Sequence, residues 1–371
     1  MRLGILSPGA KGATCGVADH TRLLSSQWRS QGYEVLVVTT SSIQDSAREF
    51  ASFAPQWVVM QYTPQLYGPG TRGVALFLAS HVSLLRRALQ CKVALIAHEL
   101  HYPVSLSSRG LLLGLPQRLQ IGALAKTADA VFVTTSKFKE QLSQITRRVG
   151  SMPEILPVGS NIGESALASP QEREIFRRQW RHSHGLSADT RLLVHFGGAH
   201  PTRLFHLGWE ALDAATDRWG AEKVRMVYLG LTPDQLSESL SLANLSRLTP
   251  QVSAYGVLPA EQIVSWLRAS DVTIAPFMDG ISTRRGSAMA AMANHCPIAT
   301  TRGVQTDVHT PWDELCAISS DDGFRDYPSR VVNLLEQPDI ALKIAVRAKK
   351  YYDASFSWPV ISNAILTKLE A

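Results

Sequence analysis

The chain has 371 residues, of which 45% are hydrophobic and 18% are charged. These values are ordinary for a globular enzyme and exclude a disordered or fibrous protein, and the length predicts two domains of roughly 100–200 residues each. Lysine and arginine number 37 against 31 aspartate and glutamate, and the net charge of +6 is too small to demand a nucleic-acid partner.

The excess positive charge is confined to the N-terminal half. Residues 1–180 carry 19 cationic and 11 acidic side chains, a balance of +8, whereas residues 181–371 carry 18 and 20, a balance of −2. This asymmetry has two interpretations. Either the N-terminal half faces an anionic partner, such as a membrane surface or a charged acceptor, or it is a basic surface that contacts only water.

No segment predicts export or a membrane span. The first nine residues lack the apolar core of a signal peptide, and the most apolar window, residues 106–124, contains Arg109 and Arg118. The four cysteines form no CxxC pair, which indicates neither a zinc site nor a disulfide framework. We therefore expect a cytoplasmic protein, with peripheral contact at the inner face of the cell membrane as the variant that the basic half suggests.

Short β-branched runs alternate with longer amphipathic stretches along the chain. The predicted strands are residues 3–6, 34–39, 57–61, 93–97, 130–134 and 154–158, then 192–196, 224–229, 252–255, 272–275 and 297–300. The predicted helices are residues 19–31, 74–89 and 137–144, then 207–219, 260–269 and 287–293. The final segment, residues 351–369, is predicted to be helical after a break at residues 356–359. This alternation is typical of parallel sheets covered by helices on both faces, an α/β fold.

A polar stretch, residues 164–189, separates two α/β halves. We expect an N-terminal domain over residues 1–165 and a C-terminal domain over residues 186–351. Ligands of such folds bind beyond the carboxyl ends of the strands, so two domains of similar size predict a ligand cleft between them.

The common catalytic and metal-binding signatures are missing. Residues 68–73 match GxGxxG, but this loop begins six residues past its strand and belongs to the third strand unit, so a turn entering a helix explains it better. No P-loop, HExxH or GxSxG motif occurs, and the pair Asp321-Asp322 is better explained as a solvated loop. The sequence predicts neither a metal nor a cofactor.

Glycine-rich loops follow the first strand of each half. In residues 12–19, the backbone amides and Gly16 would let a phosphate or a sugar approach closely. Residues 196–203 occupy the equivalent place in the second half, where Gly198 lies in the loop and Arg203 supplies a cation. Both loops are candidate ligand sites.

A histidine and a carboxylate, His98-Glu99, end the strand at residues 93–97. They would point a hydrogen-bond donor and a carboxylate into the predicted cleft. A purely structural role for His98, as a cap of backbone groups, is the alternative.

Residues 276–287 leave a strand and enter a helix. Arg284 and Arg285 lie beside the unpaired amides expected at the helix start, a combination that favours a diphosphate site. Asp279 precedes them and would accept hydrogen bonds from sugar hydroxyls. The alternative is a capped helix with solvated arginines.

These motifs resemble those of family 4 of the glycosyltransferases, a retaining group with the GT-B fold, including bacterial polysaccharide-type enzymes. The resemblance covers nearly the whole chain and rests on Gly16-Val17-Ala18-Asp19-His20-Thr21, His98-Glu99, Ser136 to Leu142, Tyr255-Gly256-Val257-Leu258, Ala269-Ser270-Asp271-Val272 and Phe356-Ser357-Trp358. It implies two Rossmann-like domains facing across a cleft, with the C-terminal helix, residues 352–371, crossing back to the N-terminal domain.

Two departures from the family pattern concern charge. The family commonly has arginine and lysine five residues apart after the first strand of the second domain, whereas Gly198 stands at the arginine position here and Arg203 at the lysine position. Arg284 and Arg285, in a loop three residues longer than the family's, would replace the missing charge.

A third departure concerns carboxylates. Of the family's two glutamates, seven residues apart, the second corresponds to Ala290, and strict spacing puts Ser282 at the first. Matching the strand end instead pairs Asp279-Gly280 with the family's Glu-Gly, a register that keeps a carboxylate near the sugar hydroxyls.

The resemblance implies a metal-independent, retaining hexosyltransferase without a cofactor, which moves glucose from UDP-glucose to a saccharide or lipid-linked saccharide in polysaccharide synthesis. His98, Asp279 and Arg203 would be catalytic, and Glu99 would act on the acceptor or as an acid or base. Val257 and Leu258 would contact the nucleobase. The residues that would bind the donor diphosphate and sugar are Gly16, Gly198, Gly280, Ile281, Ser282, Thr283, Arg284 and Arg285.

Two other functions remain open. An epimerase or hydrolase of the same architecture needs several acid/base carboxylates, of which only Glu99 and Asp279 are evident. A non-catalytic subunit that binds sugar nucleotides is suggested by the missing glutamate. The leucine-rich residues 105–126 are either a membrane-docking segment or a core helix hairpin.

Overall fold

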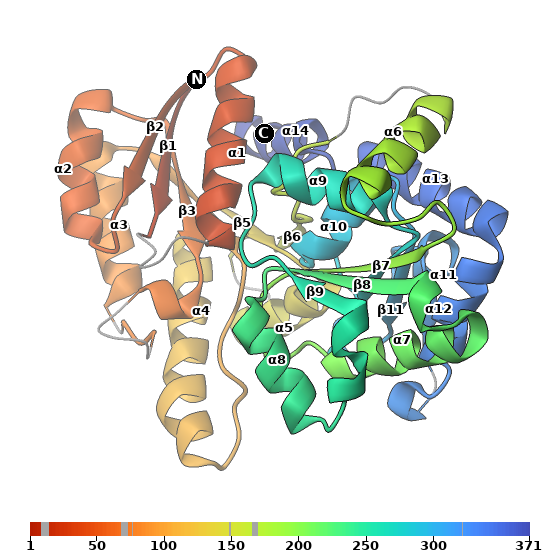
Figure 1. Ribbon diagram of the computed structural model, residues 1–371. Helices are drawn as coiled ribbons and strands as arrows, with labels where there is room; N and C mark the ends of the chain where they lie inside the picture. The colour runs from red at the N-terminus through yellow and green to blue at the C-terminus, as the bar shows by residue number, and fades with distance from the viewer. Residues whose placement is uncertain (9–14, 68–72, 76, 148–149, 165–169, 321) are drawn as a thin grey trace. The chain divides into compact units, whose positions relative to one another are not determined.

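A computed structural model describes residues 1–8, 15–67, 73–75, 77–147, 150–164, 170–320 and 322–371. The chain divides into two compact units, which are described separately. Unit 1 comprises Met1–Asn161 and Ser357–Ala371, and unit 2 comprises Ile162–Phe356 (Figure 1).

Unit 1 is built on a six-stranded parallel sheet in the order β2-β1-β3-β4-β5-β6. Its strands are β1 (Arg2–Ser7), β2 (Glu34–Thr39), β3 (Trp57–Tyr62), β4 (Lys92–Ala97), β5 (Ala130–Val133) and β6 (Glu154–Ile155). Every residue of β3 is buried, as expected for a central strand covered on both faces. Because all strands are parallel, their carboxyl ends lie along one edge of the sheet.

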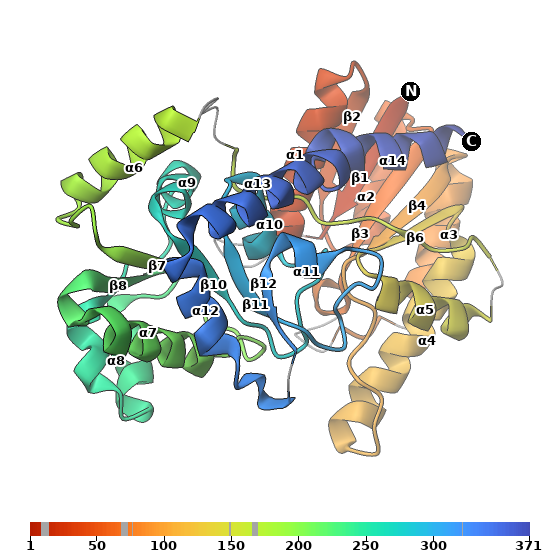
Figure 2. The same cartoon turned by 90° about the vertical axis from the view of Figure 1, so that its right-hand side faces the viewer.

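Helices cover both faces of this sheet. They are α1 (Gly16–Ser30), α2 (Ile43–Phe53), α3 (Leu78–Leu89), α4 (Leu115–Thr127), α5 (Ser136–Thr146) and α14 (Trp358–Glu370). Leu24 and Trp28 of α1 pack with Ile361 and Ile365 of α14 on one face, and Figure 2 shows these two helices side by side. The other helices pack on the opposite face.

Unit 2 repeats this plan with the strand order β12-β11-β10-β7-β8-β9. Its parallel strands are β7 (Arg191–Phe196), β8 (Val224–Leu229), β9 (Val252–Ala254), β10 (Val272–Ala275), β11 (Ile298–Thr301) and β12 (Ala317–Ser319). The two parallel six-stranded sheets confirm the predicted α/β class.

The helices of unit 2 form two layers. One layer consists of α9 (Ala260–Ala269), α10 (Gly286–Ala293), α11 (Trp312–Leu315) and α13 (Pro338–Ser355), and the other of α7 (Phe205–Trp219), α8 (Pro233–Leu242) and α12 (Tyr327–Glu336). Helix α8 begins at a capping box in which Thr232 and Gln235 satisfy each other's backbone N–H groups. The sequence patterns did not single out α8, α12 or most of α13.

Several predicted elements differ from the structure; the strand predicted over residues 154–158, for example, is β6 over Glu154–Ile155 only. Helix α3 begins at Leu78, whereas we predicted a helix from residue 74. The polar stretch at residues 164–189 contains helix α6 (Pro170–Ser183), which belongs to unit 2. This helix is held by Arg181, whose side chain is only 3% exposed and pairs with Asp271; such a contact is invisible to a composition argument.

The leucine-rich segment has an exposed apolar face. Leu106, Leu111, Leu112, Leu115 and Leu119, here called the leucine surface, are 44–94% exposed. Helix α4 carries the end of this segment and projects past the neighbouring helices of unit 1 (Figures 1 and 2). Among the described residues, no helix is both long and apolar enough to cross a membrane.

Candidate functional site

In unit 2, backbone hydrogen bonds lock together the loops that follow β7, β8 and β9. The Gly197 N–H donates to the Leu229 carbonyl at 2.7 Å, which joins the first two loops. The second and third loops are joined by two further bonds of 2.7 Å, from the Gly230 N–H to the Gly256 carbonyl and from the Gly256 N–H to the Leu231 carbonyl. At Gly197, φ is +126° and a Cβ would lie 2.0 Å from the Arg203 guanidinium, so glycine is required there. These loops form a fixed rim along the carboxyl edge of the sheet.

Arg203 lies at this edge and is largely buried. Its Cζ is 5.4 Å from the centroid of the Phe277 ring, Nη2 is 3.4 Å from Ser287 Oγ, and Nη1 is 3.3 Å from His195 Nε2. Burial and the neighbouring Arg285 cation lower the pKa of Arg203 to about 10. No carboxylate in the described ranges pairs with Arg203. A buried cation next to a second cation is stabilised by an anion that binds from solution.

The second cation comes from the loop that leaves β10. The Arg285 Cζ lies 4.4 Å from the centroid of the Phe277 ring. Its Nη1 is 3.4 Å from the Oγ1 of Thr202, in the loop that also holds Arg203. Asp279 accepts hydrogen bonds from both Arg285 and Arg284, the latter at 3.2 Å. The structure therefore brings Arg203, Arg284, Arg285 and Asp279 together, with more positive than negative charge in this set.

Gly280 allows this loop to turn. Its φ is +87°, and a Cβ would lie 2.2 Å from the Gly303 nitrogen, so a side chain would push the loop away from the segment after β11. The Gln305 N–H donates to the Asp279 carbonyl at 2.8 Å, which fixes the loop from the same side. Asp279 is thus held at the carboxyl edge of the sheet by backbone contacts as well as by arginines.

Several other residues predicted to bind the donor are engaged in this loop. The Ile281 N–H donates to Thr301 O at 2.9 Å, and the Thr283 N–H donates to the Asp307 carboxylate at 2.6 Å, so neither amide is open to a phosphate in this arrangement. Ser282 is fully buried, with a hydroxyl that has no hydrogen-bond partner among the described residues.

Two further positions bear on the departures from the family pattern. A Cβ at Gly198 would meet only the Gly230 carbonyl, at 3.6 Å, so nothing else in the described part of unit 2 demands glycine there. Ala290, at the position of the family's second glutamate, belongs to α10 and is fully buried in the core of unit 2. At the rim, Val257 is 73% exposed, whereas Leu258 packs against the core.

In unit 1, His98 and Glu99 follow β4 at the carboxyl edge of the sheet. The His98 Nε2 is 2.7 Å from Gln61 Oε1, and the Gln61 side chain is fully buried at the end of β3. Burial lowers the pKa of the His98 imidazole to about 4. A neutral His98 therefore donates Nε2–H to Gln61 and keeps an acceptor nitrogen at Nδ1.

A second imidazole, His20 of α1, packs edge-on against His98 with ring centroids 4.8 Å apart, and against Trp358 at 5.1 Å. Burial and then the neighbouring His98 lower the pKa of His20 well below its usual value. Gln61 and His20 were missing from the predicted site. One sequence signal for Gln61 was available, since it is an amide inside the otherwise apolar run of β3.

Gly16 and Glu99 remain candidates. A Cβ added at Gly16 would have no heavy atom of the described protein within 4 Å. Glu99 is half-buried, and no hydrogen bond or ion pair of its side chain occurs among the residues that the structure describes. Residues 12–14 of the same predicted loop lie outside the described residues, as do the residues 68–72 of the GxGxxG match and Asp321.

The buried imidazoles give a pH prediction. In the unfolded chain a histidine binds its proton near pH 6.5, whereas folded His98 does so at about 4. Between these values the unfolded chain binds more protons, so the contribution of neutral His98 to stability is complete above about pH 6.5 and is lost as the pH falls toward 4. We expect His98→Asn to flatten the decline of the thermal midpoint measured between pH 7 and pH 5.

The matched control is His182→Asn, because His182 is exposed on α6. Its midpoint should decline with pH as steeply as that of the unaltered protein. An equal slope in the His98 variant and in this control would contradict the assignment of His98 as a neutral buried imidazole.

Within the described ranges, no group of three or more histidine, cysteine, aspartate and glutamate side chains is arranged to hold a metal ion. The three buried cysteines are Cys91, Cys296 and Cys316. Burial raises the pKa of the first two thiols to about 11 and that of the third further. These thiols are inert at neutral pH.

No family model matches the sequence, and no curated protein sequence matches it significantly. Solved structures do match it. Sucrose-phosphate synthase from Thermosynechococcus elongatus has a TM-score of 0.71 at 15% identity, over 99% of this chain and 97% of that one. Anabaena HepE in complex with UDP-glucose has a TM-score of 0.67 at 13% identity, over 100% and 99% of the two chains.

A third match is a glycosyltransferase from Rickettsia africae, with a TM-score of 0.71 at 12% identity over 100% of this chain and 97% of that one. These three matched structures are glycosyltransferases of the GT-B class. At such low sequence identity, the structural similarity establishes the fold alone. The matches cover both units of the chain. The chain therefore has the GT-B fold, as the sequence resemblance predicted.

Proposed function

We propose that the protein is a glycosyltransferase that moves a hexose from a UDP-sugar, with UDP-glucose as the first candidate, to a saccharide or a lipid-linked saccharide. The observation that carries this proposal is the Arg203–Arg285 pair around Phe277, at the start of α10. Two half-buried guanidinium groups that flank one ring suit a diphosphate, which accepts several charge-assisted hydrogen bonds. The HepE neighbour was solved with UDP-glucose and with UDP.

In this proposal the charge of the leaving UDP is stabilised by arginines and needs no metal. Arg203, Arg285 and the first amides of α10 would bind the diphosphate, and Arg285 would supply the charge that is absent at Gly198, because it reaches the same loop through Thr202. Asp279, held between Arg284 and Arg285, would accept hydrogen bonds from sugar hydroxyls. Val257 and Leu258 would contact the base.

His98 of unit 1 would hold the sugar through its Nδ1 acceptor, and Glu99 would contact the acceptor. The family resemblance further suggests retention of the anomeric configuration. The acceptor hydroxyl would attack C1 on the face that the UDP oxygen leaves. The bond from C1 to UDP breaks, the bond from C1 to the acceptor oxygen forms, and the proton passes to the leaving phosphate. Asp279 is occupied by two arginines, which disfavours an epimerase that would need it as a free base.

The deciding experiment incubates the protein with labelled UDP-glucose and candidate acceptors, with EDTA present in one arm. Release of UDP together with a new α-glycoside, unchanged by EDTA, is the expected result. An epimerised donor, or free sugar without transfer, would favour the epimerase or hydrolase. Tight UDP-glucose binding without turnover over a broad acceptor set would favour the non-catalytic subunit suggested by Ala290.

We also propose peripheral contact of unit 1 with an anionic membrane through the leucine surface. Between Glu99 and Asp129 the sequence has no carboxylate, while Arg109, Arg118 and Lys126 are exposed. Exposed leucines beside cations without acidic neighbours suit a bilayer interface.

The double variant Leu112→Ser/Leu119→Ser tests this contact. The unaltered protein should sediment with phosphatidylglycerol vesicles and not with phosphatidylcholine vesicles, and the variant should stay in the supernatant. Leu242→Ser, at a leucine of α8 that is 79% exposed, is the control and should bind vesicles normally. Equal sedimentation of all three proteins would refute the assignment.

A further inference from the structure

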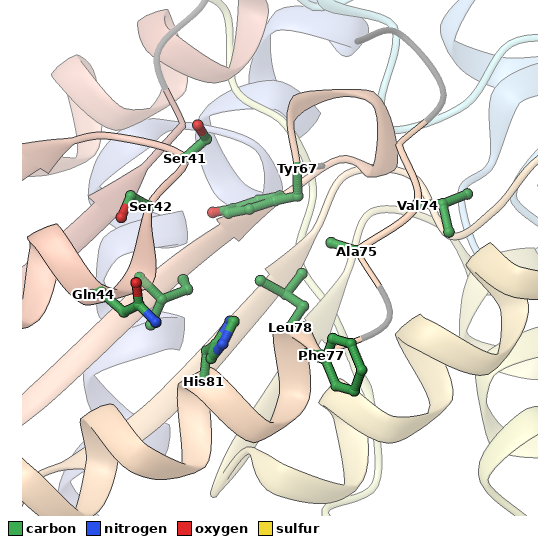
Figure 3. A pocket seen from close by; sticks show the side chains of 10 residues that line it. Ser41, Ser42, Gln44, Tyr67, Val74, Ala75, Phe77, Leu78 and His81 are labelled. Atoms are coloured by element: carbon green, nitrogen blue, oxygen red, sulfur yellow. The ribbon is translucent and has the colours of Figure 1, made fainter. Parts of the chain in front are cut away.

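Unit 1 contains a hollow at the start of α2 and α3, beside the carboxyl edge of its sheet. Its volume is about 470 Å³. In Figure 3, Ser41, Ser42 and Gln44 lie on one side of the hollow, and Tyr67, Leu78 and Phe77 lie on the other.

A second hollow, of about 200 Å³, continues the first along the two helices. The two share Ile43, Gln44 and His81, and the second extends to Leu84 and Ala88. The shared residues place the two hollows next to each other between α2 and α3, and we call them together the α2/α3 groove. It runs from the edge of the sheet to the outer part of the helices.

The chemistry of the groove changes along its length. Ser41 and Ser42 line only the inner hollow, Gln44 and His81 line both, and the outer hollow adds the apolar side chains of Ala47, Leu84, Leu85 and Ala88. Among the lining residues that the structure describes, none is a lysine, arginine, aspartate or glutamate. Phe77 and Leu84 are 71% and 60% exposed, so a ligand that covers them gains hydrophobic stabilisation.

The inner end of the groove connects to His98. The Tyr67 hydroxyl donates to the Gln61 carbonyl at 2.9 Å, and the Gln61 side chain binds the His98 imidazole at 2.7 Å. Tyr67 is fully buried and stacks on Tyr62, with ring centroids 5.9 Å apart. The inner hollow therefore lies near the carboxyl ends of β3 and β4. His98, which we assign to the donor sugar, follows β4 at the same edge of the sheet.

We propose that the α2/α3 groove binds the acceptor and that the acceptor is amphipathic, with a neutral polar head at the inner end and a hydrocarbon chain along Leu84 and Ala88. This inference rests on the proposed function, since it assigns the acceptor of that reaction. The neutral lining selects an uncharged chain next to the head, and the apolar outer end selects hydrocarbon rather than a second sugar.

The test uses alkyl β-glucosides with six, seven and eight carbons, each below its critical micelle concentration, and measures binding by calorimetry without donor. Full burial of a methylene corresponds to about fourfold in affinity. We expect the affinity to rise severalfold with each added carbon, and glucose alone to bind too weakly to detect.

Two variants locate the binding in the groove. Ala47→Trp fills the outer hollow, since Ala47 lines it from α2, and Leu84→Ser removes its exposed wall. Each should weaken octyl glucoside binding at least tenfold and abolish the dependence on chain length. The control Leu242→Ser, outside the groove, should bind like the unaltered protein, and UDP binding should be the same in all four proteins.

Binding that ignores chain length, or octyl glucoside binding that survives both variants, would overturn the proposal. So would a dimer, detected by sedimentation, that Ala47→Trp converts to a monomer, because a second copy would then occupy the groove. Failure of the glycosyltransferase proposal is distinguishable, since it would appear as absent UDP binding while the alkyl glucosides still bind.

Discussion

Replacement of Arg203 by alanine is expected to lower kcat for sugar transfer by about 10²–10³-fold, the usual loss when one group that stabilises developing charge is removed. The charge that develops on the leaving UDP has few other partners. Arg284 and Arg285 each donate a hydrogen bond to the Asp279 carboxylate, whereas Arg203 pairs with no carboxylate in the described ranges. Of the three arginines, Arg203 has the most to gain from a bound diphosphate.

The measurement is a steady-state assay of UDP release, paired with calorimetric binding of UDP. Arg203→Lys keeps the positive charge but loses the planar fork, so we expect it to recover part of kcat. Arg247→Ala is the matched control, because Arg247 is an exposed arginine of unit 2 that pairs with Asp213. It should retain full activity.

Since Arg203 also packs against Phe277 and His195, folding of the alanine variant must be checked by circular dichroism and thermal unfolding. A folded Arg203→Ala protein with normal kcat would remove Arg203 from the reaction. A folded variant that binds UDP weakly but turns over normally at saturation would make Arg203 a ground-state binding residue only.

The class of fold was predictable because short apolar runs, which form the strands, alternate regularly with amphipathic stretches, which form the helices. β1 and β7, for example, are continuous buried strands that lead directly into glycine-rich loops. Runs of this kind depend only on local sequence, and the alternation with amphipathic helices leaves few architectures other than parallel α/β.

The candidate site was predictable only in part, because loops after strands can be placed from sequence but side-chain contacts cannot. Arg284 and Arg285 lie near Asp279, as adjacent positions in one loop suggest, yet their ion pairs with it are a tertiary result. Gln61 and His20 are more than 35 residues apart, and no local pattern links either one to His98. The α2/α3 groove likewise depends on how two helices pack.

Helix α6 is the clearest failure of local reasoning. Its segment is strongly polar, which led us to treat residues 164–189 as a divider between domains. One arginine on its inner face, Arg181, enters the core of unit 2, where it donates to the carbonyls of Ala269 and Thr190 and to the Asp271 carboxylate. Trp180 of the same helix packs against this core and contacts Trp266 edge-on, with ring centroids 5.8 Å apart. The helix is therefore held by an aromatic contact and a buried ion pair rather than by a broad apolar stripe.

This anchor leads to the largest expected effect on stability. Asp271 Oδ2 accepts hydrogen bonds from Arg181 Nη2 and from the Leu192 N–H, each at 2.7 Å, and its Oδ1 pairs with Arg177. Arg181 is 3% exposed, so Asp271→Ala would leave a buried guanidinium without its counterion. Breaking a buried pair by removing one partner costs about 3–5 kcal/mol.

For a unit of this size, that cost corresponds to a fall of roughly 6–20 °C in the thermal midpoint of unit 2. Asp313→Ala is the matched control, because Asp313 also pairs with an arginine, Arg302, but its side chain is 73% exposed. Exposed pairs contribute about 0–1 kcal/mol, so its midpoint should shift by less than about 4 °C.

Thermal unfolding of both variants distinguishes a structural Asp271 from a ligand-binding one. The structural assignment predicts that Asp271→Ala lowers the midpoint equally with and without UDP, and that kcat is retained at temperatures where the variant is folded. Similar midpoints for Asp271→Ala and Asp313→Ala would show that the Arg181 pair does not hold α6. Loss of UDP binding in a variant of normal stability would instead place Asp271 in the nucleotide site.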